Sequence, residues 1–62
     1  MKKFRVCIAS RYMYNEYREY DIYYVNAKSF ENAMRYAKRV VSHWNSKDNS
    51  TTYEIDHIDE VA

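Results

Sequence analysis

Residues 29–44 read SFENAMRYAKRVVSHW, and this stretch determines the fold that we expect. Its apolar side chains recur at spacings of three and four, which is typical of an amphipathic helix of about four turns. These apolar residues are Phe30, Ala33, Met34, Ala37, Val40, Val41 and Trp44. Ser29 is a favourable N-cap, and Glu31 complements the positive end of a helix. We expect the helix to stop at Asn45, a residue type that tolerates the left-handed conformation.

Three segments around this helix have the alternation of β-strands. Residues 3–12 place one set of side chains on one face and a second set on the other. The first set is Phe4, Val6 and Ile8, and the second is Arg5, Cys7, Ala9 and Arg11. Residues 17–26 are rich in tyrosine, which favours a second strand, with a turn near Asn15 before it. Residues 52–58 alternate again, with Tyr53 and Ile55 inward, and lose the alternation at Ile58.

The second strand has two possible orientations toward the helix. Either Tyr20, Ile22 and Tyr24 face it, or Tyr23, Val25 and Ala27 do. We favour the second set, because Ala27 lies just before Ser29 and must lead the chain over the core. Residues 45–51 contain no apolar side chain and indicate a mobile surface loop between the helix and the last strand.

These elements predict an α+β fold in the order β-β-α-β: a three-stranded antiparallel sheet with one helix packed on one face. Residues 1–62 form a single domain with one core. One helix covers only one face of the sheet, so we expect the other face to be open. It would expose an apolar patch made of Cys7, Ala9, Tyr20, Ile22 and Tyr24.

The charges nearly cancel, with ten Lys and Arg against nine Asp and Glu. The chain therefore lacks the overall positive charge that would favour nucleic acid as its main partner. The distribution along the chain is uneven, because residues 1–11 carry four basic side chains and no acid, whereas residues 54–60 carry four acids and no Lys or Arg. These opposite charges would meet if the first and last strands pair.

The apolar runs are too short for a signal peptide or a membrane-spanning helix. A single cysteine, Cys7, allows no intrachain disulfide and suits a reducing compartment. We therefore expect a soluble, cytoplasmic protein without a membrane role.

The sequence gives little support for catalysis, a cofactor or a metal. Cys7, His43 and His57 are the soft metal-ligand types, but none forms a pair with metal-site spacing. We interpret them as a packed thiol and two surface imidazoles. Glu54 and Asp56 are neighbours on one strand face, for which solvated charge is the commoner explanation. The absence of glycine excludes phosphate-cradling glycine loops.

Tyrosine and arginine residues near the hairpin are the main candidates for a binding surface. Both types are enriched at binding hot spots, since they bury large areas and keep polar atoms. The hairpin candidates are Arg11, Tyr12, Tyr14, Tyr17, Arg18, Tyr20 and Tyr24, and a basic helix face adds Arg35, Lys38 and Arg39. Individual tyrosines can equally fill the core, and the helix charges can serve solvation alone. The same aromatics can also stack on bases of single-stranded nucleic acid.

The stretch from Tyr24 to Ala33, in which a strand ends in an alanine and Ser29 caps an alanine-rich helix, resembles small phage-encoded α/β proteins. With Lys2-Lys3-Phe4 opening the first strand, the order of elements is similar to the T7-phage inhibitor of bacterial RNA polymerase. That resemblance implies a protein that disables a host enzyme by docking on it. The resemblance implies a partner-facing surface with acidic residues on the helix and basic residues on the last strand. In this chain the charges are exchanged, with basic residues on the helix and acidic residues on the last strand. The resemblance therefore implies the class of host-blocking proteins, anti-CRISPRs included, rather than the polymerase as target.

We therefore expect a small non-enzymatic inhibitor or adaptor that acts by protein-protein contact on a host protein in the bacterial cytoplasm. We also expect a homodimer through the open sheet face. The alternatives are a nucleic-acid-binding module that uses the same tyrosines, or an oligomer that sequesters a nucleotide between subunits.

Overall fold

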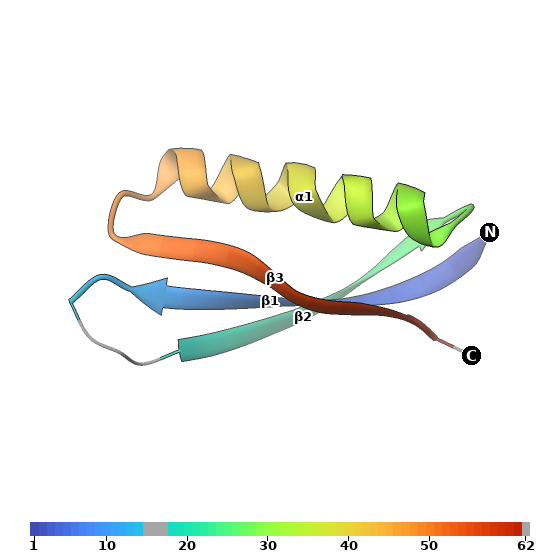
Figure 1. Ribbon diagram of the computed structural model, residues 1–62, viewed down its shortest axis with the longest axis horizontal. Coiled ribbons are helices and arrows are strands. Elements are labelled where there is room, and N and C mark those ends of the chain that lie inside the picture. The colour runs from blue at the N-terminus through green and yellow to red at the C-terminus, as the bar shows by residue number, and fades with distance from the viewer. Residues whose placement is uncertain (15–17, 62) are drawn as a thin grey trace.

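The computed structural model describes residues 1–14 and 18–61. Its elements are β1 (Lys2–Tyr12), β2 (Arg18–Ala27), α1 (Phe30–Lys47) and β3 (Thr51–Val61). The strands form one antiparallel sheet in the order β2-β1-β3, and α1 lies along one face of it (Figure 1). The predicted α+β fold is thus confirmed. No helix in the described part of the chain is both long enough and apolar enough to cross a membrane.

The core lies between α1 and the central strand. Phe4, Val6 and Ile8 of β1 are almost completely buried. Ala33 and Ala37 of α1 are fully buried, and their small side chains let the helix approach the sheet closely. Phe30, predicted to be a core residue, is 48% exposed, because it lies at the first helical position and contacts Phe4 only edge-on, with ring centroids 6.2 Å apart.

The orientation predicted for the second strand is confirmed. Tyr23 and Val25 are half-buried against the core, and Ala27 is buried. Ser29 caps α1 as expected, since its hydroxyl accepts a hydrogen bond from the backbone N–H of Asn32 at 3.2 Å. This bond satisfies one of the free donors of the first helical turn.

The predicted loss of alternation near Ile58 has a structural cause. Ile58 lies opposite Val6, and His57 opposite Cys7, but the next pair joins Ile8 to Ile55. Asp56 is therefore an extra residue, a β-bulge, in β3. Because of this bulge, Ile55 and Ile58 both pack against the core although they are three residues apart.

The predicted end of the helix is wrong. α1 continues through Asn45 to Lys47, and Asp48 follows in an extended conformation with φ of −124°. The amide of Asn45 instead forms two hydrogen bonds with the backbone of Tyr53, donating to its carbonyl oxygen at 2.9 Å and accepting from its N–H at 2.8 Å.

The connection from α1 to β3 is consequently residues 48–50, not the mobile loop predicted over 45–51. The carboxylate of Asp48 accepts hydrogen bonds from the backbone N–H groups of Ser50 and Thr51, at 2.8 and 3.1 Å. These bonds lower the pKa of Asp48 below its ordinary value. Polar side chains in this segment thus order the backbone, which composition alone does not reveal.

The basic and acidic ends of the chain meet, as expected from their charges. β1 and β3 are antiparallel neighbours, which brings the two ends of the chain together. The Lys2 ammonium lies 3.8 Å from a carboxylate oxygen of Glu60, and the Arg5 guanidinium lies 2.8 Å from one of Asp59. All four side chains are partly exposed, so each pair stabilises the fold only slightly.

Candidate functional site

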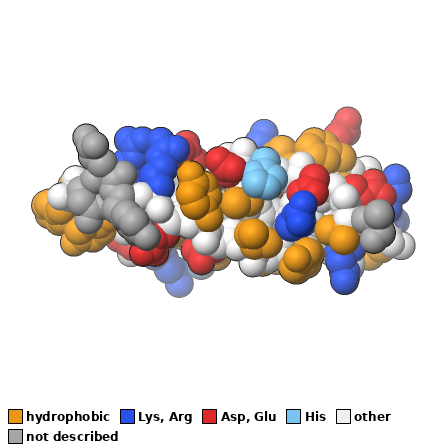
Figure 2. All heavy atoms as spheres, turned by 90° about the horizontal axis from the view of Figure 1, so that it is seen from below, with side chains coloured by type: hydrophobic (Ala, Val, Ile, Leu, Met, Phe, Trp, Pro, Cys, Tyr) orange, Lys and Arg blue, Asp and Glu red, His pale blue; other side chains and the backbone are white. Residues whose placement is uncertain are grey.

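The face of the sheet that points away from α1 is the candidate site, and we call it the open face. Side chains from the three strands form rows across it, following the pairing register. The rows are Tyr24, Arg5 and Asp59; then Ile22, Cys7 and His57; then Tyr20, Ala9 and Glu54; and last Arg18, Arg11 and Thr52. Figure 2 shows this face with hydrophobic side chains in its middle and at one end, and with charged side chains and a histidine among them.

One border of the open face is hydrophobic. Tyr20, Ile22 and Tyr24 of the edge strand β2 point outward at alternate positions and are 54%, 58% and 58% exposed. We call these three residues the β2 ridge. Lys3 of β1 lies over the Tyr24 ring, with its ammonium 5.8 Å from the ring centroid. Aromatic residues with polar tips in this position can contact both apolar and polar partner groups.

The sequence predicts that the centre of the open face is exposed, but the structure shows that it is buried. Cys7 and Ala9 are only 4% and 2% exposed, so the prediction that they form part of an exposed apolar patch is wrong. Both are small residues on the central strand, and in the pairing register they lie between larger residues of β2 and β3. Within the four rows described above, the exposed large hydrophobic side chains are therefore those of the β2 ridge.

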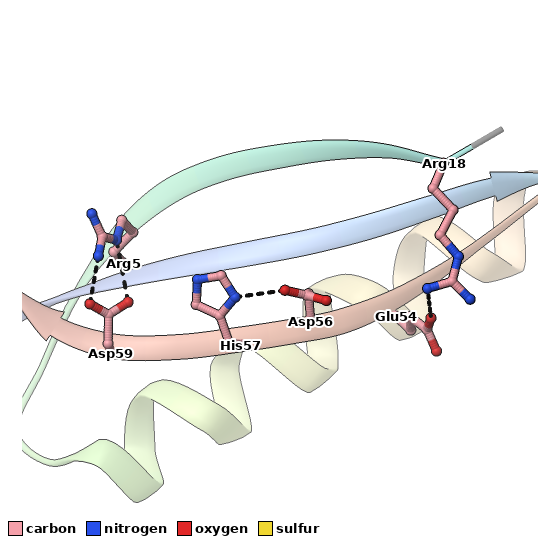
Figure 3. Close-up of polar contacts among 6 residues, drawn as sticks. All are labelled: Arg5, Arg18, Glu54, Asp56, His57 and Asp59. Atoms are coloured by element: carbon pink, nitrogen blue, oxygen red, sulfur yellow. Dashed lines mark hydrogen bonds and ion pairs between the residues drawn. The ribbon is translucent and has the colours of Figure 1, made fainter.

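The opposite border, on β3, is polar. Figure 3 shows three contacts that follow one another along this strand: Arg5 with Asp59, His57 with Asp56, and Arg18 with Glu54. The Arg5 guanidinium donates to both carboxylate oxygens of Asp59, at 3.3 and 2.8 Å, which raises the pKa of Arg5. Arg18 reaches across β1 to Glu54 at 3.8 Å, so it joins the two borders.

The hairpin end carries several of the predicted site residues. Arg11 and Arg18 lie directly opposite one another, beside a hollow of about 190 Å³ with Ala9 and Thr52 in its lining. Tyr12 and Tyr14 are 43% and 74% exposed, and their ring centroids are 5.2 Å apart. Tyr17, and Asn15 at the predicted turn, lie outside the described residues.

The three basic residues of the helix do not join this site. Arg35, Lys38 and Arg39 are exposed on α1, which covers the other face of the sheet. A flat partner surface that contacts the open face does not reach them. The structure thus brings the hairpin candidates Arg11, Arg18, Tyr20 and Tyr24 onto one face, and separates the helix candidates from them.

A cluster that the sequence did not predict joins the central strand to the polar border on β3. Potential ligand atoms of Cys7, Asp56 and His57 all lie within 4.8 Å of one another. Burial raises the pKa of the Cys7 thiol, and the negative charge of Asp56 adds to this effect. The three residues come from strands far apart in sequence, and their spacing gives no motif. The signal is the pairing register of β1 and β3, which periodicity alone does not fix.

Comparison with known proteins does not assign the chain to a group. No protein family, curated protein or solved structure matches it. Its function is therefore inferred from the chemistry of the open face.

Proposed function

We propose that this chain is a small non-enzymatic binding protein that blocks a partner protein by docking its open face on it. Small phage-encoded inhibitors of host protein machines act in this manner, and the chain resembles them in its order of elements. The observation that supports the proposal is the β2 ridge. Three successive outward positions of an edge strand are hydrophobic, and each is more than half exposed.

The hydrophobic side chains of the ridge are better suited to contact with a protein than to exposure to solvent. Exposed Tyr and Ile side chains that adjoin one another on a monomer typically mark an interaction surface. Truncating a central tyrosine of such a surface commonly costs about 2 kcal/mol of binding free energy or more. The arginines nearest the ridge, Arg5 and Arg18, are held by Asp59 and Glu54, so they offer oriented donors at its margin.

The polar border on β3 favours a protein partner over a nucleic acid. Glu54 and Asp59 lie on the same face as the ridge, with side chains 63% and 42% exposed, and Asp56 is exposed beside them. Two of these carboxylates pair with Arg5 and Arg18, so the face alternates positive and negative groups and offers no continuous basic track for a phosphate backbone. A protein partner can pair its own basic or neutral groups with these carboxylates, so the proposal is consistent with the whole face.

Affinity capture from a bacterial lysate, followed by reconstitution with the purified partner, tests the proposal. We expect Tyr20→Ala and Tyr24→Ala each to weaken binding by about tenfold or more, as measured by calorimetry. Tyr36→Ala is the matched control, because Tyr36 is 49% exposed but belongs to α1. It should bind like the wild type.

Equal affinity of the wild type and both ridge variants for the same partner contradicts the proposal. A titration with labelled single-stranded DNA and RNA covers the competing class. Tight binding that falls steeply with salt, and that depends on Tyr20 and Tyr24, would assign the open face to nucleic acid instead.

A further inference from the structure

Three different metal-ligand side chains converge on the open face where β1 meets β3. Cys7 lies directly opposite His57, and Asp56 precedes His57 in the chain. Their potential ligand atoms lie within 4.8 Å of one another, and Asp56 Oδ2 is 2.7 Å from His57 Nδ1. We propose that Cys7, Asp56 and His57 bind a single zinc ion. This site is separate from the ridge and does not rest on the proposed partner.

The ligand set is suited to zinc. Tetrahedral zinc accepts cysteine sulfur at about 2.3 Å, histidine nitrogen at about 2.0–2.1 Å and carboxylate oxygen at about 2.0–2.2 Å. Such bonds place the ligand atoms about 3.3–3.8 Å apart. The present separations need adjustments of about 1 Å, which side-chain rotations supply. A thiolate and an imidazole together select zinc over magnesium or calcium, which prefer all-oxygen sites.

The β-bulge places two of the ligands on one face. In a regular strand, consecutive residues such as Asp56 and His57 point to opposite faces. Here the extra residue turns Asp56 toward the side of His57, and the two side chains contact one another (Figure 3). Bulges commonly re-aim a side chain beside a functional site.

The core itself does not require Asp56. The pairs on either side of the bulge are Val6 with Ile58, Cys7 with His57, and Ile8 with Ile55. A strand without Asp56 would keep all three pairs in ordinary alternation and would still turn both isoleucines toward α1. Packing therefore leaves Asp56 unexplained, whereas a metal site gives it a role.

The local charge also suits a cation. Zinc would balance the Asp56 carboxylate and would stabilise the thiolate form of the buried Cys7, which lies beside it. The side chains of Asp56 and His57 are 40% and 54% exposed, so the ion has a path from solvent. With three protein ligands, the fourth coordination position would point out of the open face, toward water or a bound partner.

Titration of the purified, metal-free protein with Zn²⁺ and Co²⁺ tests this site. We expect one ion per chain with micromolar or tighter affinity by calorimetry. With Co²⁺ we expect tetrahedral ligand-field bands and a sulfur-to-cobalt charge-transfer band. His57→Gln and Asp56→Asn should each weaken binding by at least about tenfold. Cys7→Ser should abolish the charge-transfer band. His43→Gln, which changes the other histidine, on α1, should bind like the wild type.

Deletion of Asp56 separates loss of the site from loss of the fold. We expect the deletion variant to keep the circular dichroism spectrum and cooperative unfolding of the wild type but to bind zinc at least about tenfold more weakly. The proposal is overturned if the wild type binds no zinc at micromolar concentrations, or if His43→Gln weakens binding as much as His57→Gln. It is also overturned if the Asp56 deletion binds normally. None of these results depends on the partner assay, so the two proposals can fail independently.

Discussion

Two isoleucines on opposite faces of the sheet offer a direct test of which face is covered. Ile8 on β1 is completely buried beneath α1, in contact with the cluster that contains Ala37. Ile22 on the neighbouring strand belongs to the open face and is 58% exposed. The same substitution, Ile→Ala, removes the same atoms at both positions. We predict that Ile8→Ala destabilises the protein far more than Ile22→Ala does.

The magnitudes follow from burial. Removing three buried carbon groups costs about 2.4 kcal/mol in transfer free energy, and the cavity left behind brings Ile8→Ala to about 3–4 kcal/mol. Ile22 buries less than half of its surface and leaves no cavity, so Ile22→Ala should cost about 1 kcal/mol. A chain of 62 residues is stabilised by only about 3–9 kcal/mol in total, so the first variant should lie near its limit of folding.

Urea denaturation followed by Trp44 fluorescence measures both values. Trp44 is half-buried, with its ring 5.3 Å from that of Tyr53 and 6.4 Å from that of Tyr23, so unfolding changes its surroundings. With a slope of about 1 kcal/mol per molar urea, the two midpoints should differ by about 2 M or more. If Ile8→Ala does not fold, Ile8→Val and Ile22→Val give the same comparison at about 0.5–1.5 kcal/mol for the buried site.

Equal costs at the two positions would refute this reasoning. Such a result means that Ile22 is buried in solution, so that its face is already covered. Dependence of the Ile22→Ala cost on protein concentration would then identify a second copy of the chain as the cover. A cost at Ile22 that is independent of concentration would contradict the open face itself.

Three further predictions follow from the described contacts. Ser29→Ala should destabilise the fold by about 1 kcal/mol in urea denaturation, because it removes the N-cap bond to Asn32, whereas Ser29→Asp should remain close to the wild type. Because the folded pKa of Asp48 is lowered, its stabilisation is complete above the ordinary pKa of about 4 and is lost as the pH falls through the folded pKa. Melting temperatures measured against pH should therefore fall less steeply in acid for Asp48→Ala and Asp48→Asn, and an unchanged acid slope would contradict the role of this carboxylate. We also expect homodimers through the open face at protein concentrations above those of the urea experiment, detected by sedimentation equilibrium and weakened by Tyr24→Ala; a monomer at high concentration excludes them.

The local pattern of the sequence was sufficient for the element order, the buried face of the helix and the orientation of β2. These features depend on periodicity and capping, which act over a few residues. The alternation of β1 predicts Phe4, Val6 and Ile8 in the core, and they are buried there. Ser29 marks the start of the helix for the same local reason.

Several features of the candidate site instead depend on contacts between distant residues. Asn45 is of a residue type that often ends a helix. Here its side-chain amide forms hydrogen bonds with Tyr53 on β3, and the helix continues. Alternation predicts an exposed position for Cys7, but on the central strand, between Ile22 and His57, it is only 4% exposed.

By itself, the sequence determined that a helix covers one side of a three-stranded sheet, because hydrophobic periodicity is written along each segment. Only the tertiary structure decided that His57 lies opposite Cys7 and that a bulge turns Asp56 beside them. The physical reason is that strand register is fixed by the sum of pairings across the sheet. Neither strand carries that information alone.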